Sequence, residues 1–362
     1  MVKNQVTAIQ FFSLLYLSLL STVFMYLSSP HIKLAQTDAL LRPIVFIGIA
    51  LLVGIPVFYI SKRNKELASN RQYINKTKFL KTVAVVYAVI YFVSIIKTIA
   101  RFDLFVSSEL FPNADMFIFL AGIIIVCALL SLSGLGALSR AGLVFAFLVG
   151  VSTVIVMFSL REEVDIFNFT PLFQNGTKTF LQESLLFSVQ ATEIGAITVF
   201  LPHIKGNIKK SFIGWSVLSG VSVSLILFFV VGSLGAFADT QLFPTYTAVS
   251  LASFGLLERI DAFETGVWII CAVEKIALYF LVVTKTLGYT LKGVSQRVLT
   301  IGSVAAAVVL SVIISRNIEN FAFLSSDILT VVLFVMATVI LPVALLIYIR
   351  RVKPCEKKDE SI

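Results

Sequence analysis

Long apolar runs are the feature that most constrains this chain. Each run is close to 20 residues long, which is the length that an α-helix needs to cross the hydrocarbon core of a bilayer. Inside lipid a helix satisfies its own backbone hydrogen bonds, whereas an irregular segment leaves polar groups unpaired. The sequence therefore predicts an all-α membrane protein that crosses the bilayer many times.

The composition supports the same interpretation. Of the 362 residues, 58% are hydrophobic and 14% are charged, whereas soluble domains carry about 25% charged residues. The mean hydropathy of +0.97 is too high for a soluble domain, because its surface would be largely apolar. The 32 phenylalanines suit a surface that faces lipid.

We expect ten spans in a single membrane domain that covers residues 1–362. The first run continues for about twenty residues beyond Lys3 without a cleavage site, so we interpret it as a retained span rather than a signal peptide. The predicted spans lie near residues 7–29, 39–60, 82–106, 115–136, 141–160, 183–201, 211–237, 263–290, 298–315 and 326–349.

Basic residues indicate the orientation of the chain, because cytoplasmic loops are rich in lysine and arginine. With ten spans, every basic cluster falls on the same side as the N-terminus. We therefore predict a multi-pass membrane protein with both termini in the cytoplasm. The clusters are Lys62, Arg63, Lys65, Arg71, Lys76 and Lys78; Lys205, Lys209 and Lys210; Lys292 and Arg297; and Arg350, Arg351, Lys353, Lys357 and Lys358.

Ten spans can divide into two halves of five, and an odd number in each half makes the two halves inverted repeats. This LeuT-like arrangement is common among secondary transporters, and its binding site lies at mid-membrane where helices are discontinuous. The first span of each half is broken in such proteins. We therefore expect breaks in spans one and six of this chain.

Several other classes of function are excluded. The net charge of +9 comes from short loop clusters without the interleaved aromatics of a single-strand binder, so no nucleic-acid partner is expected. The three cysteines show no ligand spacing, and His31 and His203 lie in loops on opposite sides. We expect no metal and no cofactor. The sequence has no catalytic triad, zinc motif or nucleotide-binding loop, so we do not expect an enzyme.

Span six is the most polar of the predicted spans. It carries Thr192, Glu193 and Gly195 near its middle, and a charge within a span usually marks a pathway or a pair. A helix break at this point would free backbone groups for a small polar ligand or an ion. The alternative is a continuous helix in which Glu193 pairs with a basic residue.

Spans one and three supply further candidate ligand contacts. Ser21 and Thr22 lie in span one, although hydroxyl groups can also bond back to their own helix. Tyr87 and Tyr91 share one face of span three and could stack on a ligand or hydrogen-bond to it. The alternative for both pairs is helix packing alone.

Other charged residues lie within spans three and eight. Glu274 and Lys275 are adjacent in span eight and point about 100° apart, so each should meet another helix, and Glu193 with Lys275 is one candidate pair. Glu274 is a candidate ligand contact. Lys97 lies deep in span three and could pair with an acid, whereas we expect Arg101 to reach the outer interface along its aliphatic stem. The sequence leaves open whether these residues form a structural ion pair, a proton relay or a ligand anchor.

A charged segment opens span eight. Glu258, Arg259 and Asp261 stand in or just before the first turns of its helix, where the helix dipole favours acids. They predict a charged gate at the outer mouth, and an ordinary helix start is the simpler alternative. The loop at 238–261 carries Pro244 and could act as a lid or as a passive connector.

The same segment carries a resemblance to a known family. Phe243-Pro244-Thr245, then Leu257-Glu258-Arg259-Ile260-Asp261-Ala262-Phe263, then Trp268 resemble the endospore germination permeases, the B subunits of nutrient germinant receptors. The resemblance implies an amino acid–polyamine–organocation type fold in the spore inner membrane. It also implies a small nutrient germinant as ligand, and a larger membrane subunit (A-type) and a lipoprotein subunit (C-type) as partners.

Two functions follow from these expectations. The first is a transporter-like sensor that binds a nutrient, most simply an amino acid, between spans one, three, six and eight and triggers germination. The alternative is a proton- or sodium-coupled amino acid transporter with the same fold but with net flux of solute. Solute accumulation in vesicles that contain the protein alone would distinguish the two.

Overall fold

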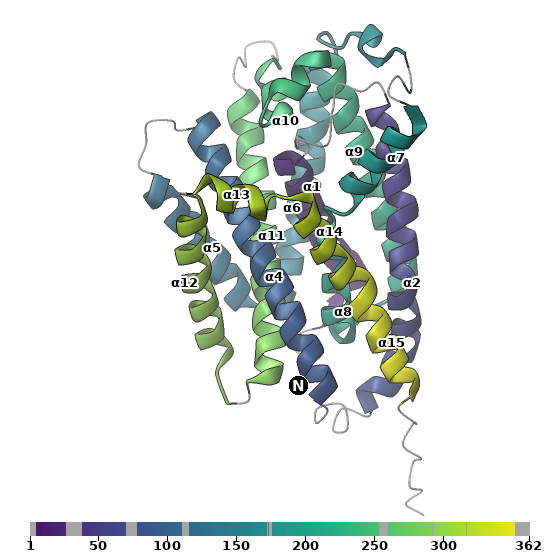
Figure 1. Ribbon diagram of the computed structural model, residues 1–362, viewed down its shortest axis with the longest axis vertical. Coiled ribbons are helices and arrows are strands. Elements are labelled where there is room, and N and C mark those ends of the chain that lie inside the picture. Colours follow the sequence, from purple (N-terminus) through teal and green to yellow (C-terminus); the bar gives the residue numbers. More distant parts are fainter. Residues whose placement is uncertain are drawn as a thin grey trace, which may run out of the picture.

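The computed structural model describes residues 5–26, 38–69, 78–110, 116–171, 173, 176–252, 260–291, 293–315 and 317–351. In these ranges the chain is almost entirely helical, and its long helices run alongside one another as a bundle (Figure 1). The described strands are β1 (Val6–Thr7) and β2 (Ile204–Lys205), which pair in parallel.

The longer helices follow the predicted order along the chain. They are α1 (Ala8–Tyr26), α2 (Arg42–Ser69), α4 (Lys78–Phe105), α5 (Met116–Ser133), α6 (Leu135–Ser159), α7 (Gly176–Ser188), α9 (Ile208–Leu234), α11 (Ile260–Thr290), α12 (Gln296–Ser315), α14 (Asp327–Val335) and α15 (Leu341–Arg351). The shorter segments are η1 (Ala39–Leu41), η2 (Val106–Leu110), η3 (Ile166–Phe169), η4 (Thr192–Gly195), α8 (Ala196–Phe200), η5 (Leu201–His203), η6 (Gly235–Thr240), α10 (Pro244–Ser250), α13 (Ile318–Leu324) and η7 (Met336–Ile340).

Helices lie in each range where a span was predicted. Within the described ranges, eight helical segments are long and apolar enough to cross a membrane, and a bent pair makes nine. The shorter apolar stretch Leu120–Ser133 of α5 occupies the fourth predicted range. The chain is therefore a multi-pass helical membrane protein.

The sixth predicted span is broken. The segments Gly176–Ser188 and Thr192–His203 meet at an angle of 50°, with residues 189–191 between them. The polar residues of this segment predict such a break. A break is tolerated at membrane depth only where protein surrounds it. Figure 1 shows the two halves as α7 and α8.

The first predicted span is not broken in the described part, so that expectation is wrong. Helix α1 is continuous from Ala8 to Tyr26 and contains neither glycine nor proline. Two of its hydroxyl groups bond back to the preceding turn: Ser13 to the Ile9 carbonyl oxygen at 3.0 Å and Thr22 to the Ser18 carbonyl oxygen at 3.1 Å. Such back-bonding satisfies the side chain without opening the helix.

Helices α1 and α11 form the centre of the bundle. In both helices 83% of the apolar membrane-spanning stretch is buried, whereas the corresponding share for α6 is 22%. Helix α11 packs on α4, α1, α5 and α6, and α1 packs on α6, α11 and α9. The outer helices present large apolar side chains such as Phe147 and Ile328, exposed by 71% and 79%, which is the surface that lipid requires.

The first and last described segments lie at the same end of the bundle. The Phe12 ring contacts Phe212 at 5.9 Å, and Phe212 contacts Phe58 at 5.2 Å. Next to Phe58, the Tyr59 ring lies 5.8 Å from the guanidinium carbon of Arg350, near the end of α15. The start of α1 and the end of α15 therefore share one side of the protein.

Gly142 lies where α6 packs tightly against α1. A Cβ atom at this position would lie 3.3 Å from the backbone Cα of Leu14. We predict that Gly142→Leu forces the two helices apart and lowers the free energy of unfolding by about 1–3 kcal/mol or more. Thermal unfolding of the protein in nanodiscs measures the change.

Gly150→Leu is the matched control, because Gly150 lies on the same helix and a Cβ atom there would meet no other atom within 4 Å. Equal unfolding temperatures for the two variants would show that the close contact between α1 and α6 at Gly142 does not determine the stability of the protein.

Candidate functional site

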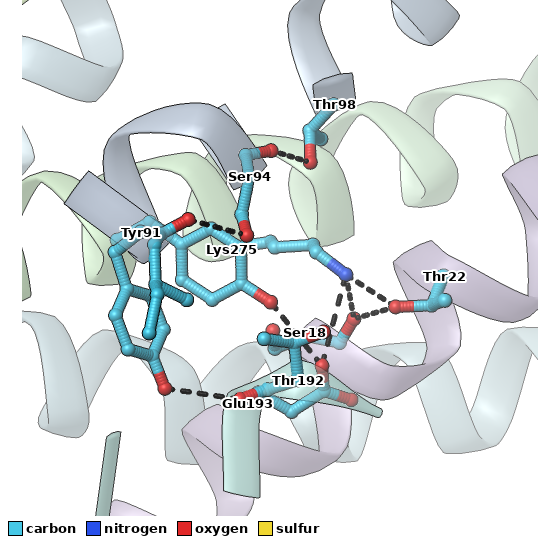
Figure 2. Close-up of polar contacts among 10 residues, drawn as sticks. Ser18, Thr22, Tyr91, Ser94, Thr98, Thr192, Glu193 and Lys275 are labelled. Atoms are coloured by element: carbon cyan, nitrogen blue, oxygen red, sulfur yellow. Dashed lines mark hydrogen bonds and ion pairs between the residues drawn. The ribbon is translucent and has the colours of Figure 1, made fainter. Parts of the chain in front are cut away.

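The break between α7 and α8 brings a carboxylate into the centre of the protein. After Ser188 the chain leaves the helix, and it resumes as the short η4 from Thr192 to Gly195. Glu193 lies in this turn and is fully buried, with 0% of its surface exposed. Figure 2 shows Glu193 surrounded by polar side chains from other helices.

Glu193 forms an ion pair with Lys275 of α11. The Lys275 Nζ lies 3.8 Å from Glu193 Oε2, and the Tyr279 hydroxyl donates to the same oxygen at 3.2 Å. Lys275 also donates to the Ser18 carbonyl oxygen at 3.4 Å and to the Thr22 hydroxyl of α1 (Figure 2). The pair thus joins α1, the broken segment and α11, and the candidate pair Glu193–Lys275 is present in the structure.

Tyrosines of α4 satisfy backbone carbonyls beside the break. The Tyr91 hydroxyl donates to the Thr192 carbonyl oxygen at 3.0 Å, and the Tyr87 hydroxyl donates to the Ala337 carbonyl oxygen at 3.1 Å. Ala337 belongs to η7, a π-helical turn between α14 and α15, and such turns often occur at functional sites. α4 therefore ties both irregular segments together.

A small polar cavity lies beside the ion pair. It has about 20 Å³ of internal space, which is room for about one water molecule. An amino acid does not fit in this conformation, so binding requires the cavity to widen. The lining residues come from α1, α4, the break, α11 and α14: Thr22, Ser94, Lys97, Thr98, Gln190, Thr192, Lys275, Tyr279, Thr330 and Leu333.

Two cationic side chains line this cavity. Lys97 of α4 is buried and donates to the Thr330 hydroxyl, while Lys275 approaches from α11. Glu193 is the paired carboxylate, and its Oε1 atom has no hydrogen-bond partner among the described residues. The arrangement places two ammonium groups at the cavity and, behind its lining, one buried carboxylate oxygen without a described partner.

Arg101 differs from the sequence expectation. It is buried rather than extended to the interface, with 9% of its surface exposed. Its Nε donates to the Met25 carbonyl oxygen at 2.8 Å, and its Nη2 donates to the Leu242 carbonyl oxygen at 3.3 Å. The guanidinium group lies over the ring of Phe243. Arg101 therefore joins the end of α1 to the segment before α10, because the exposed carbonyls there need donors.

The structure brings most of the predicted site residues together. Thr22, Thr192, Lys97 and Lys275 line the cavity. The residues that support it from behind are Glu193, Tyr87, Tyr91 and Gly195.

The other predicted site residues lie elsewhere. Ser21 is buried in α1 but does not line the cavity. Glu274 also does not line it, since it lies on a different face of α11 from Lys275. Asp261 stands in the first turn of α11, where its carbonyl oxygen accepts from Thr265. Glu258 and Arg259 lie outside the described residues.

Sequence reasoning missed several contributors. Thr330 and the backbone of Ala337 come from the last apolar run, where a hydroxyl among apolar residues was the only available signal. Tyr279 follows Lys275 by four residues and therefore shares its helix face, a spacing that could have identified it.

The ion pair generates the first prediction for the site. Glu193→Gln leaves Lys275 buried without a carboxylate, and removal of one partner of a buried pair costs about 3–5 kcal/mol. We expect a clear fall in the unfolding temperature of the purified protein.

The double variant Glu193→Gln with Lys275→Met removes both charges and should recover part of this loss. A double variant that is less stable than either single variant would contradict the pairing.

Gly195 generates the second prediction. A Cβ atom here would lie 2.8 Å from both Ala337 Cβ and Tyr91 Oη and 2.9 Å from the Ala337 carbonyl oxygen. We expect Gly195→Ala to push η4 away from η7 and to destabilise the protein by about 1–3 kcal/mol. Gly214→Ala is the control, because its Cβ would meet no atom within 4 Å. Thermal unfolding compares the two, and equal stability would exclude a tight contact at Gly195.

Comparison with known proteins identifies the family. A search of curated proteins gave no match. The sequence profile of the family described as spore germination protein, the spore permeases, matches residues 5–321. The match covers most of the chain and includes the broken segment and all of α11, so the chain belongs to the spore germination protein family.

Proposed function

We propose that this chain is the transporter-like membrane subunit of a nutrient germinant receptor. It would bind a small nutrient at mid-membrane, at the cavity between α1, α4, the broken sixth segment, α11 and α14. The observation that carries the proposal is the buried set of Lys97, Lys275 and Glu193 beside a helix break. Membership of the spore germination family supplies the biological setting.

The charges favour an amino acid as the nutrient. An amino acid carries a carboxylate and an ammonium group a short distance apart. Lys97 and Lys275 line the cavity and suit the carboxylate. The Oε1 atom of Glu193, which lies behind the lining without a described partner, would suit the ammonium group once the cavity widens. A neutral sugar would leave the second lysine without a counter-charge in a low-dielectric site, which is unfavourable.

Binding would act by selecting a wider conformation. The cavity of about 20 Å³ is closed to a nutrient, so only a rearranged state can bind it. The bend at residues 189–191 is the natural hinge, since few backbone bonds need to change there. Neighbouring A-type and C-type subunits would read the change.

The wider architecture belongs to the same proposal. It consists of ten spans in a LeuT-like five-plus-five inverted repeat, with both termini in the cytoplasm. The broken sixth segment and the location of both described chain ends on one side of the bundle support it. The nutrient would then approach from the side that carries α10 and the start of α11.

The second candidate is a proton- or sodium-coupled amino acid transporter. The same broken segment with a buried carboxylate favours it, because coupling ions bind at such sites. Accumulation of radiolabelled amino acid in vesicles that contain this protein alone would favour transport over sensing.

We predict that Lys97→Gln weakens the nutrient response. Loss of one charge-assisted hydrogen bond of about 1.5–3 kcal/mol raises the required nutrient concentration by about 10- to 100-fold. Spores that lack the gene are complemented with each variant, and germination is scored by loss of refractility across amino acids, sugars and nucleosides. Membrane abundance of each variant is measured in parallel.

Lys209→Gln is the control, because Lys209 is exposed at the start of α9. If Lys97→Gln and wild type give the same dose response at equal abundance, the site assignment fails. If deletion changes no response, the sensor proposal fails.

A further inference from the structure

Beside Lys275, helix α11 carries another buried ionisable residue, Glu274, which does not line the nutrient cavity. Lys275 points to α1, while the preceding residue, Glu274, is rotated by about 100° around the helix. The thiol of Cys127 on α5 lies 3.7 Å from the carbonyl oxygen of Val273, which places α5 beside this face. The thiols of Cys127 and Cys271 both lie near Glu274.

Glu274 differs from the other buried glutamates of the described chain. Glu183 pairs with Arg42, Glu193 pairs with Lys275, and Glu264 accepts from Ser152. Glu274 is 0% exposed, and neither of its carboxyl oxygens has a hydrogen-bond partner among the described residues.

The helices packed on α11 direct their ionisable groups elsewhere. α5 offers the Cys127 thiol as its one ionisable side chain, and α8 and α10 offer only Tyr246 in their described sequences. On α1, Tyr16 bonds to Ser222. On α4, Tyr87 and Tyr91 donate to backbone carbonyls, Lys97 bonds to Thr330, and Arg101 bonds to the Met25 carbonyl oxygen. Asp103 of α4 lines a separate small cavity between α4, α5 and α12, and Lys78 and Lys81 lie in the first turn of α4. Arg140 of α6 and Arg297 of α12 are exposed.

An ionised carboxylate without a partner is unstable in such a place. Burial of an unpaired charge costs several kcal/mol or more, so the group binds either a proton or a cation. The described residues contain no cluster of three or more histidine, cysteine, aspartate or glutamate side chains that could hold a metal. Thiols also suit hard monovalent cations poorly.

We propose that Glu274 is a proton-binding site, separate from the nutrient site, in the seam between α11, α5 and α6. Buried hydroxyl groups of Ser131 on α5 and Ser139 on α6 also have no described partners. Ser131 lies one turn beyond Cys127 on the same face of α5, toward the end of the bundle where α5 meets α6. These two hydroxyls are further buried polar groups without a described partner in the region where α5 adjoins α6.

The proton on Glu274 would stabilise the position of α11 in which the seam is closed. Release of the proton leaves a carboxylate that needs water or a cation, which the closed packing does not offer. Acidic conditions therefore favour the closed seam, and alkaline conditions favour its opening.

Infrared spectroscopy of the full chain in nanodiscs tests the site at neutral pH. The difference spectrum of wild type minus Glu274→Gln should contain the C=O band of a carboxylic acid, shifted in heavy water. Glu274→Gln should also keep the wild-type unfolding temperature, because glutamine closely matches a protonated carboxyl group in shape. If the substitution removes carboxylate bands and no acid band, Glu274 is ionised in the wild type. That result would overturn the proposal, whether a cation or water stabilises the charge.

A second measurement needs no variant. Dicyclohexylcarbodiimide reacts with protonated carboxyl groups in apolar surroundings, and mass spectrometry identifies the modified residue. We expect an adduct on Glu274 that forms more slowly as the pH rises. Adducts confined to other carboxyl groups, or a rate that does not depend on pH, would contradict the proposal.

Discussion

The ion pair between Glu193 and Lys275 is the interaction on which the centre of the structure depends. Neither charge would be stable alone at this depth, because desolvation of each costs several kcal/mol. Glu193 reaches its place only because the sixth segment breaks, and Lys275 reaches it only because α11 lies centrally. The lysine also bonds to the Ser18 carbonyl and to Thr22, so the same contact holds α1. Helices α1 and α11, which this contact joins, are both strongly buried.

Backbone hydrogen bonding imposes the second constraint. The break before η4 and the π-helical turn η7 both loosen the regular pattern of bonds, and they lie against each other through Gly195 and Ala337. α4 compensates with two phenolic donors, Tyr91 to Thr192 and Tyr87 to Ala337. Irregular backbone is thus enclosed by protein at membrane depth, which is the condition for its stability. It also concentrates polar groups in one place, where a small ligand could bind.

The sequence predicted the helical segments and the break in the sixth, because apolar length and intramembrane polarity are local signals. It also named Glu193 with Lys275 as a candidate pair. It did not predict that α1 is continuous, because the LeuT-like architecture suggested a break there. The sequence also does not show that the Thr22 hydroxyl bonds back to its own helix. The contacts of Thr330 and Arg101 depend on how distant helices are rotated against each other. Such rotation is set by packing across the bundle and not by spacing along the chain.

Glu274 and Lys275 show that adjacent ionisable residues on one buried helix need different surroundings. One turn of α11 cannot direct both toward the same cavity, so the helix must bury them in two different seams. One seam supplies Lys275 with a carboxylate and hydroxyl groups, while the other places Glu274 near two thiols and gives its carboxyl oxygens no hydrogen-bond partner among the described residues. A rigid helix moves both residues together. A ligand that shifts α11 through Lys275 therefore also changes the surroundings of Glu274, and a proton on Glu274 must in turn alter the affinity for that ligand by the same factor.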